Sequence, residues 1–329
     1  MGWSGKKVLV TGAGGFIGSH LTEELVRLGA EVRALVRYNS QGSWGNLELS
    51  PPDVRREVEV LAGDVRDPFF VDHAVGGAEV VFHLASLIAI PFSYVAPQSY
   101  VETNVTGTLN VLQAARRHGV GKVVHTSTSE TYGTALYTPM DERHPLQGQS
   151  PYSASKIGAD KLAESFNRSF DLPVATIRPF NTYGPRQSAR AVIPTIVSQA
   201  LARDRIELGS LTPVRDLTFV GDTVRGFVRV AEAPETAGET VNVGSGHGVT
   251  VGELAERILS LLGRSLPIAA AEERLRPERS EVFTLICDNR KAAEMLGWRP
   301  SVSLDDGLRA VIDWVQEHPA LYKAEAYNV

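Results

Sequence analysis

Short apolar runs alternate with helical patterns through the first half of the chain. The apolar runs are rich in valine, leucine and alanine, are bounded by Gly, Asp or Pro, and lie at residues 7–10, 32–36, 58–62, 80–84, 122–126 and 174–178. Such runs are typical of strands that are buried on both faces of a sheet. Helical patterns fall between them, at residues 16–28, 98–118 and 152–170. This alternation predicts an α/β fold with a doubly wound parallel sheet and helices on both of its faces.

The pattern becomes less regular after Arg178, where prolines stand at positions 179, 185, 194 and 213. A second, smaller lobe is therefore expected to begin near Phe180. Residues 219–222 are predicted to end a strand and begin a helix that runs to about 231. A further strand is predicted at 239–243, and further helices at 251–262 and 304–316.

The two predicted units interleave along the chain. The sheet domain takes residues 1–179 and about 217–243, and the smaller C-terminal lobe takes about 180–216 and 244–329. Open parallel sheets bind ligands outside the carboxyl ends of their strands. A ligand is therefore expected where those strand ends meet the smaller lobe.

A glycine-rich turn follows the first predicted strand directly, because residues 11–18 read Thr-Gly-Ala-Gly-Gly-Phe-Ile-Gly before a helical pattern. In this setting Gly12 permits the tight turn, Gly15 lets the backbone approach a pyrophosphate, and Gly18 lets the helix pack closely on the strand. The alternative is a glycine-rich turn that binds nothing. The strand–turn–helix context favours a Rossmann domain that binds a dinucleotide.

Tyr152 and Lys156 stand about 140 residues after this turn, within a predicted helix. Residues four apart share one face of a helix, and an ammonium beside a phenol favours the phenolate. The pair would then form a base that removes a proton from a sugar or alcohol hydroxyl near neutral pH. Such a pair alone is more often a surface tyrosine and a solvated lysine. The preceding dinucleotide turn favours the catalytic interpretation.

Composition and charge exclude several classes of protein. The 329 residues suffice for two packed units, and a net charge of -5 gives no support to a nucleic-acid partner. A single cysteine, Cys287, rules out an internal disulfide and suits a reducing cytoplasm. We expect no signal peptide, because the first residues lack its long apolar stretch, and no run approaches the ~20 apolar residues that a membrane span needs. No Cys or His cluster has metal-ligand spacing, so we expect a cytoplasmic protein without a metal or membrane partner.

Ordered motifs along essentially the whole chain resemble the extended short-chain dehydrogenase/reductases, and among them the nucleotide-sugar epimerases, dehydratases and decarboxylases. The motifs lie at 11–20, 63–64, 83–86, 104, 127–133, 152 with 156, 178–185 and 215–216. A narrower likeness is to bacterial sugar-nucleotide 4,6-dehydratases, including those of legionaminic acid pathways. It is carried by residues 88–91, 127–130 and 187–190.

The resemblance implies a catalytic set of Thr128, Ser129, Glu130, Tyr152 and Lys156. Thr128 would bond the sugar hydroxyl that is oxidised at carbon 4, Tyr152 would be its base, and Lys156 would hold the nicotinamide ribose. Glu130 would remove the proton on carbon 5 that the new ketone acidifies. Many dehydratases have Thr-Asp-Glu here, so Ser129 leaves the departing hydroxyl without the usual aspartic acid. GDP-mannose-type dehydratases and UDP-glucuronate decarboxylases both share Thr-Ser-Glu.

The resemblance also implies a tightly bound NADP or NAD. The second strand ordinarily ends in an acidic residue that binds the ribose 2′-hydroxyl, but here Val36 is followed by Arg37, which suits a 2′-phosphate. This pair favours NADP, against the alternative of NAD held by backbone alone. The expected cofactor contacts are Gly12, Gly15, Phe16, Ile17, Gly18, Arg37, Asp64, Val65, Leu84, Ala85, Ser86, Tyr152, Lys156 and Pro179.

The expected substrate is a nucleotide-diphosphate sugar. Asn181 matches an asparagine of the family that contacts it, and arginine suits phosphate, so candidate clamps are Arg186, Arg190, Arg215, Arg276 and Arg279. Each arginine alone is more often a solvated surface charge. By likeness to the family, helices 98–118 and 152–170 would form a homodimer interface.

The first interpretation of the whole chain is a redox-neutral nucleotide-sugar 4,6-dehydratase. The alternatives are a nucleotide-sugar 4-epimerase and then a UDP-glucuronate-type decarboxylase. A decarboxylase should need a cation for the substrate carboxylate, and the sequence assigns none to that task. A dinucleotide-binding regulator without activity is disfavoured, because it would typically lack Tyr152 or Lys156.

Overall fold

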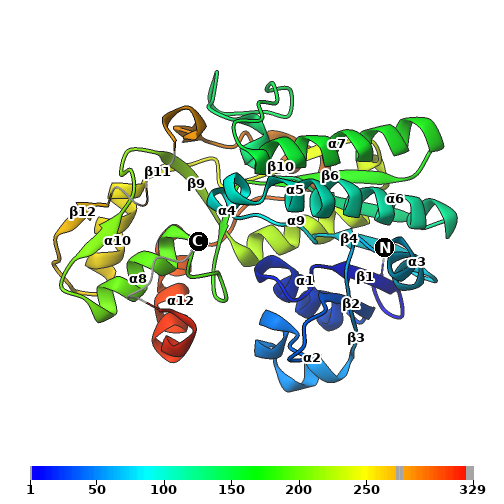
Figure 1. The fold of residues 1–329 in the computed structure, drawn as a ribbon, viewed down its shortest axis with the longest axis horizontal. Helices are drawn as coiled ribbons and strands as arrows, with labels where there is room; N and C mark the ends of the chain where they lie inside the picture. Colours follow the sequence, from blue (N-terminus) through cyan, green and yellow to red (C-terminus); the bar gives the residue numbers. More distant parts are fainter. Residues whose placement is uncertain (1, 272–273, 275–276, 324–329) are drawn as a thin grey trace.

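The computed structural model of the protein describes residues 2–271, 274 and 277–323. A larger unit built on a parallel sheet and a smaller lobe lie side by side (Figure 1). Strand β9 (Val214–Phe219) lies where the two units meet.

Seven strands form one parallel sheet in the order β10-β6-β5-β4-β1-β2-β3. Their bounds are β1 (Lys7–Thr11), β2 (Glu31–Arg37), β3 (Val58–Gly63), β4 (Val80–His83), β5 (Lys122–Thr126), β6 (Val174–Pro179) and β10 (Thr240–Val243). The chain leaves β1 first toward β2 and later returns to β4, so the strand order reverses between β1 and β4. Ligands bind at such a reversal. The predicted Rossmann fold is confirmed.

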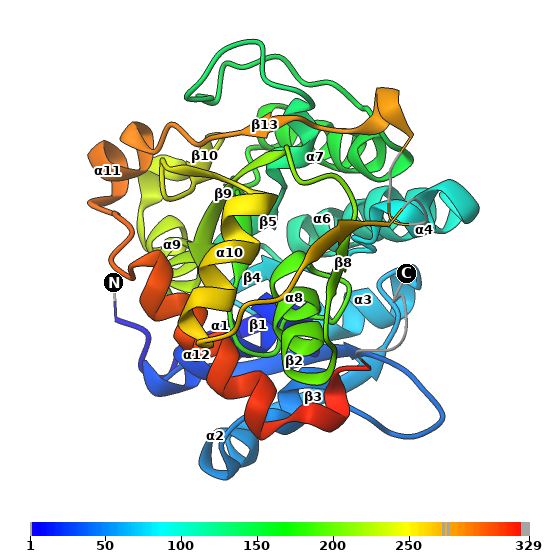
Figure 2. The same ribbon diagram turned by 90° about the vertical axis from the view of Figure 1, so that its left-hand side faces the viewer.

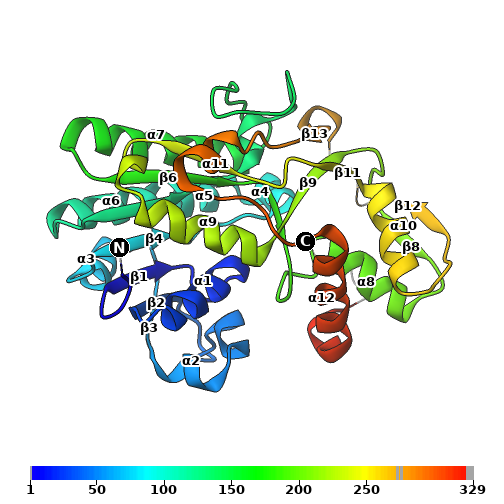
Figure 3. The ribbon, with the colours of Figure 1, turned by 180° about the vertical axis from the view of Figure 1, so that it is seen from behind.

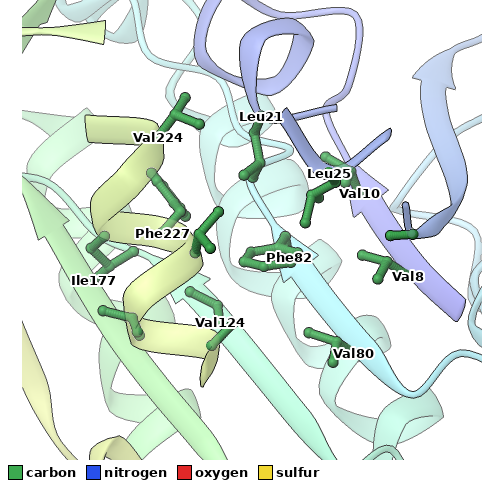
Figure 4. Packing of buried hydrophobic residues seen from close by; sticks show 14 of the residues in the cluster. Val8, Val10, Leu21, Leu25, Val80, Phe82, Val124, Ile177, Val224 and Phe227 are labelled. Carbon is green, nitrogen blue, oxygen red and sulfur yellow. The ribbon is translucent and has the colours of Figure 1, made fainter. Parts of the chain in front are cut away.

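Helices cover both faces of this sheet because side chains alternate along each strand. On β1, Val8 and Val10 enter one buried cluster and Leu9 enters the other. The first cluster packs beneath α1 (Phe16–Arg27) and α9 (Val220–Glu232), where Leu21, Leu25 and Phe227 lie around Phe82 (Figure 4). The second packs beneath α3 (Pro68–Val75), α6 (Gly107–Arg117) and α7 (Pro151–Phe170).

Helix α7 begins where the sequence predicts. Ser150 is its N-cap, and its hydroxyl and that of Ser153 form a reciprocal capping box, with Pro151 at the first helical position. Asp171 ends the helix in the left-handed conformation.

The helix predicted at 98–118 is continuous but not uniform. It consists of α5 (Pro97–Tyr100), a π-helix over Val101–Thr106 (η2), and α6. Within the π turn, Asn104 is buried and its amide bonds Leu87 N, Leu87 O and Ser155 Oγ at 2.8, 3.0 and 2.9 Å. The wide turn thus ties the loop after β4 to α7, which periodicity does not predict.

The smaller lobe packs three helices around one apolar cluster (Figure 2). The helices are α8 (Val192–Ala202), α10 (Val251–Leu261) and α12 (Leu304–Glu317). Two small sheets accompany them. In the first, β9 pairs with β11 (Gly248–Thr250), β13 (Thr284–Leu285) and β7 (Asn181–Tyr183). In the second, β12 (Ile268–Ala270) pairs with β8 (Ile206–Leu208). The short elements are η1 (Gly45–Leu49), α2 (Pro52–Arg56), α4 (Ile90–Val95), η3 (Ser129–Tyr132), η4 (Pro234–Thr236), η6 (Glu278–Ser280), α11 (Arg290–Leu296) and η7 (Pro319–Leu321).

One late segment lies elsewhere than the sequence led us to expect. We expected all of 244–329 in the smaller lobe, but α11 lies against the larger unit near β10 and α9 (Figure 3). Ala292 and Trp298 belong to the buried cluster of that unit, and the Trp298 indole donates to Asp222 O at 2.9 Å. Burial of these side chains draws the segment back to the sheet.

Candidate active site

A cavity of about 1420 Å³ lies at the carboxyl ends of the parallel strands and extends to the smaller lobe. Every residue expected to contact the cofactor lines it: Gly12, Gly15, Phe16, Ile17, Gly18, Arg37, Asp64, Val65, Leu84, Ala85, Ser86, Tyr152, Lys156 and Pro179. The expected catalytic residues Thr128, Ser129 and Glu130 line the same cavity. The structure therefore brings these two sets together.

The glycine turn between β1 and α1 has no room for side chains. Gly12 has φ +72°, and a Cβ there would lie 2.8 Å from Ala85 N. A Cβ on Gly18 would lie 2.2 Å from Gly12 O. Gly15, by contrast, is the N-cap of α1, and no side chain caps that helix. The first amide groups of α1 thus remain available to an anion, and the turn fits the pyrophosphate of a dinucleotide.

Three residues of the cavity wall each carry a buried polar atom that is unpaired among the described residues. Thr126 Oγ1, Asn181 Oδ1 and Gln187 Oε1 are shielded and have no hydrogen-bond partner within the described part of the chain. Buried polar atoms are ordinarily paired.

The catalytic candidates come from the start of α7 and the segment after β5. Lys156 Nζ donates to Thr126 O at 2.6 Å, and Tyr152 packs edge-on against the ring of Tyr100. Thr128 is the N-cap of η3, and its hydroxyl accepts from Glu130 N at 3.3 Å. This cap fixes the backbone of Glu130 relative to Thr128.

Burial controls the ionisation of the pair. It raises the pKa of Tyr152, against a hydrogen bond with Thr128 that lowers it, and the charge of Glu130 raises it further. Burial also lowers the pKa of Lys156 to about 8. The pKa of Tyr152 therefore lies above its ordinary value in the protein alone, because desolvation of the phenolate outweighs the hydrogen bond with Thr128.

The expected arginines fall into different places. Arg190 and Arg215 line the cavity, as does Asn181, and Arg215 pairs with Glu281 at 3.2 Å. Arg186 does not line it: its guanidinium lies 2.5 Å from Glu23, and both side chains are buried. Arg279 is not among the lining residues, and Arg276 lies outside the described residues.

Comparison with known proteins identifies the family to which the chain belongs. A family model described as GDP-mannose 4,6 dehydratase matches residues 9–311. The chain belongs to this family. It is 35% identical to a dTDP-glucose 4,6-dehydratase of Streptomyces antibioticus, over 96% of this chain and 94% of that protein. It is 34% identical to a UDP-glucose 4-epimerase of Mycolicibacterium smegmatis, over 94% and 98%.

A solved structure resembles the whole chain. DesIV, a dTDP-glucose 4,6-dehydratase of Streptomyces venezuelae with NAD bound, superposes with a TM-score of 0.87 at 32% identity, over 96% of this chain and 99% of that one. The predicted resemblance to nucleotide-sugar dehydratases and epimerases is thereby confirmed.

Sequence reasoning missed the segment that lies beside the glycine turn in this member of the GDP-mannose 4,6-dehydratase family. Asn39, Gln41, Ser43 and Trp44 line the cavity. Asn39 Oδ1 accepts from Gln41 N and Ser43 N at 3.1 and 3.0 Å, which shapes the loop after β2. A Cβ on Gly14 would lie 2.6 Å from Trp44 O. Only a glycine leaves room for this contact. Gly14 was therefore the residue in the sequence that could have indicated that the loop after β2 packs against the glycine turn.

The part of the chain that the structure describes has neither a metal site nor a membrane-spanning helix. No group of His, Cys, Asp and Glu side chains there is arranged to hold a metal ion. No described helix is both long and apolar enough to cross a bilayer.

Arg186→Ala is expected to lower the free energy of unfolding by about 3 kcal/mol, because it leaves the buried Glu23 charge without its partner. Arg27→Ala is the matched control. Arg27 lies 3.5 Å from the same Glu23 but is exposed, so its loss should cost less than about 1 kcal/mol. Chemical denaturation measures both. An Arg186→Ala protein of unchanged stability and raised KM would show a substrate clamp instead.

Proposed function

We propose that the protein is an NAD(P)-dependent nucleotide-sugar 4,6-dehydratase. The observation that supports this most is the presence of Glu130 in the same cavity wall as Thr128 and Tyr152. An oxidation at carbon 4 needs only the threonine, the tyrosine and the cofactor. A carboxylate beside them gives the further step, removal of the proton on carbon 5.

In the oxidation, Tyr152 takes the proton of the carbon 4 hydroxyl, which Thr128 orients. The ammonium of Lys156, held by Thr126 O, stabilises the phenolate that results from the preceding cycle. The turn of Gly12, Gly15 and Gly18 would hold NAD(P), which would supply a hydride acceptor for carbon 4 and a hydride donor for carbon 6.

In the elimination, Glu130 takes the proton of carbon 5. The carbon 4 ketone stabilises the charge that develops, and the bond between carbon 6 and its hydroxyl breaks. Because Ser129 stands where many relatives have an aspartic acid, Glu130 is the group that passes this proton to the departing hydroxyl. Hydride at carbon 6 and the proton that Tyr152 holds, delivered to carbon 5 through solvent, then complete a 4-keto-6-deoxy sugar and restore the phenolate, and the net change is the loss of one water.

The substrate side rests on the smaller lobe, which we propose as the nucleotide-sugar domain, residues about 180–216 and 244–329 without the segment around α11 that packs on the larger unit. Asn181 would contact the sugar diphosphate, and Arg190 and Arg215 would bind its phosphates. A cytoplasmic homodimer through the helices at 98–118 and 152–170 completes the proposal.

The cofactor is proposed to be NADP. Arg37 ends β2, is exposed, and lines the cavity, so it can receive a 2′-phosphate. Arg37→Ala should lose about 1.5–3 kcal/mol of NADP binding and little of NAD binding. Titration of both cofactors measures this. Arg56→Ala removes an exposed arginine that does not line the cavity, and should change neither. Equal losses for both cofactors at Arg37→Ala would refute the clamp.

A nucleotide-sugar 4-epimerase is the second candidate, favoured by the epimerase relative. Incubation with UDP-, GDP-, dTDP- and CDP-sugars, followed by mass spectrometry, separates the candidates. The proposal expects one substrate to lose the mass of one water. An unchanged mass with a new isomer supports the epimerase, and loss of carbon dioxide supports a decarboxylase.

A further inference from the structure

Three buried side chains recur every four residues along α7. Tyr152, Lys156 and Asp160 therefore share one face of the helix, and each is at most 6% exposed. Tyr152 and Lys156 line the active-site cavity, but Asp160 does not. Its carboxylate points instead into the protein, against the ends of β5 and β6.

Asp160 is the centre of a buried hydrogen-bond network. His125 Nε2 lies 3.0 Å from Oδ1, Ser127 Oγ donates to Oδ2 at 2.6 Å, and Arg178 Nη2 donates to Oδ2 at 2.8 Å. Arg178 Nε also donates to Ser127 Oγ at 3.1 Å. Ser127 immediately precedes Thr128. The network thus joins the helix that carries the base to the segment that carries its partner.

Charges in this region do not balance without Asp160. Lys156 and Arg178 are two buried cations, and burial lowers the pKa of both His83 and His125, which keeps these histidines neutral. Burial alone would raise the pKa of Asp160, but the hydrogen bond from His125 and the charges of Arg178 and Lys156 hold it well below its usual range. Asp160 is therefore an anion at neutral pH.

The other ionisable groups near this cluster line two cavities, one on either side of it. Tyr152 and Glu130 face the active-site cavity. A second cavity of about 490 Å³ reaches Asp160 and Arg178, and its wall includes Glu142, Arg143, His144, Lys161, Glu164, Glu239 and Lys291. Glu164 there pairs with Lys161 and Arg168 on α7 itself.

We propose that Asp160 is a positioning residue of the catalytic site: through Ser127 its buried carboxylate anchors the segment of Thr128 to the helix of Tyr152, and it places an anion one helical turn from Lys156. This rests on the proposed function only in assigning Lys156 its role beside Tyr152. Asp160 itself touches neither substrate nor cofactor, because it lies outside the cavity wall.

Asp160→Asn tests the proposal by a pH profile. Burial already lowers the pKa of Lys156 to about 8, and Asp160 opposes that shift. Without the anion this pKa falls, so the ammonium is lost at lower pH and the alkaline limb of kcat/KM should move down by about one pH unit or more. Glu164→Gln removes one negative charge from the next turn of α7 and should leave the limb in place.

Lysine NMR provides the measurement that needs no turnover. With ¹³Cε-labelled lysine, and Lys156→Arg to assign the signal, Lys156 should titrate near pH 8 in the unmodified protein and lower in Asp160→Asn. An equal pKa in both proteins overturns the proposal. If Asp160→Asn does not fold, a Lys156 that is neutral at pH 7 in the unmodified protein overturns it, and a charged one supports it. Failure of the dehydratase assignment would instead appear in the sugar assay and leave this titration unchanged.

Discussion

Tyr152→Phe should lower turnover about 10²–10⁴-fold, the usual contribution of a positioned base. Phenylalanine keeps the contact with the ring of Tyr100, so the helix start and the cofactor wall should remain intact. We therefore expect the variant to retain bound cofactor after purification. Steady-state kinetics and cofactor release on denaturation are the two measurements.

Tyr137→Phe is the control for this loss. Tyr137 is 45% exposed, its hydroxyl donates to Asp141 at 2.7 Å, and it lies outside the cavity wall. Its removal should leave turnover near that of the unmodified protein. A Tyr152→Phe protein with comparable turnover would remove Tyr152 from its role.

Glu130→Gln should abolish formation of the 4-keto-6-deoxy sugar while leaving oxidation at carbon 4 intact. Glutamine keeps the shape of the side chain but cannot take the carbon 5 proton, whereas Tyr152 and Thr128 still act on the carbon 4 hydroxyl. The hydride then stays on the nicotinamide. We expect the absorbance of the reduced cofactor to rise on addition of substrate, without product.

The double variant Tyr152→Phe/Glu130→Gln is the control, because it lacks the first step as well. It should show no such rise in absorbance. In a 4-epimerase no carbon 5 proton moves, so Glu130→Gln would barely alter turnover. A Glu130→Gln protein that makes product at the normal rate would remove the dehydratase assignment and support the epimerase.

Local patterns predicted the larger unit well, because its strands are short apolar runs and its turn is built from glycines. The lining of the cavity by Gly12, Gly15 and Gly18 follows from where such a turn must lie in a doubly wound sheet. Thr126 ends β5 and Ser127 and Thr128 follow it, so these residues lie at a strand carboxyl end. These placements need only the order of elements and the alternation of side chains.

Features that depend on packing between distant segments could not be predicted. Arg186 carries the charge expected of a phosphate clamp, but its partner Glu23 lies more than a hundred residues earlier in the sequence. Asp160 has no motif that reveals His125 and Arg178 as its partners. The pKa of Tyr152 likewise rises through burial, which no spacing of Tyr152 and Lys156 discloses.

The most direct test of the dehydratase assignment is the reaction run in deuterated water with the sugar nucleotide that the assay identifies. Proton removal and return at carbon 5 exchange with solvent, whereas the hydrogen of carbon 4 travels through the cofactor to carbon 6. The account predicts a product that has lost one water, carries a solvent deuteron on carbon 5, and holds the former carbon 4 hydrogen in its methyl group. A product of unchanged composition, with no deuterium bound to carbon, would contradict it.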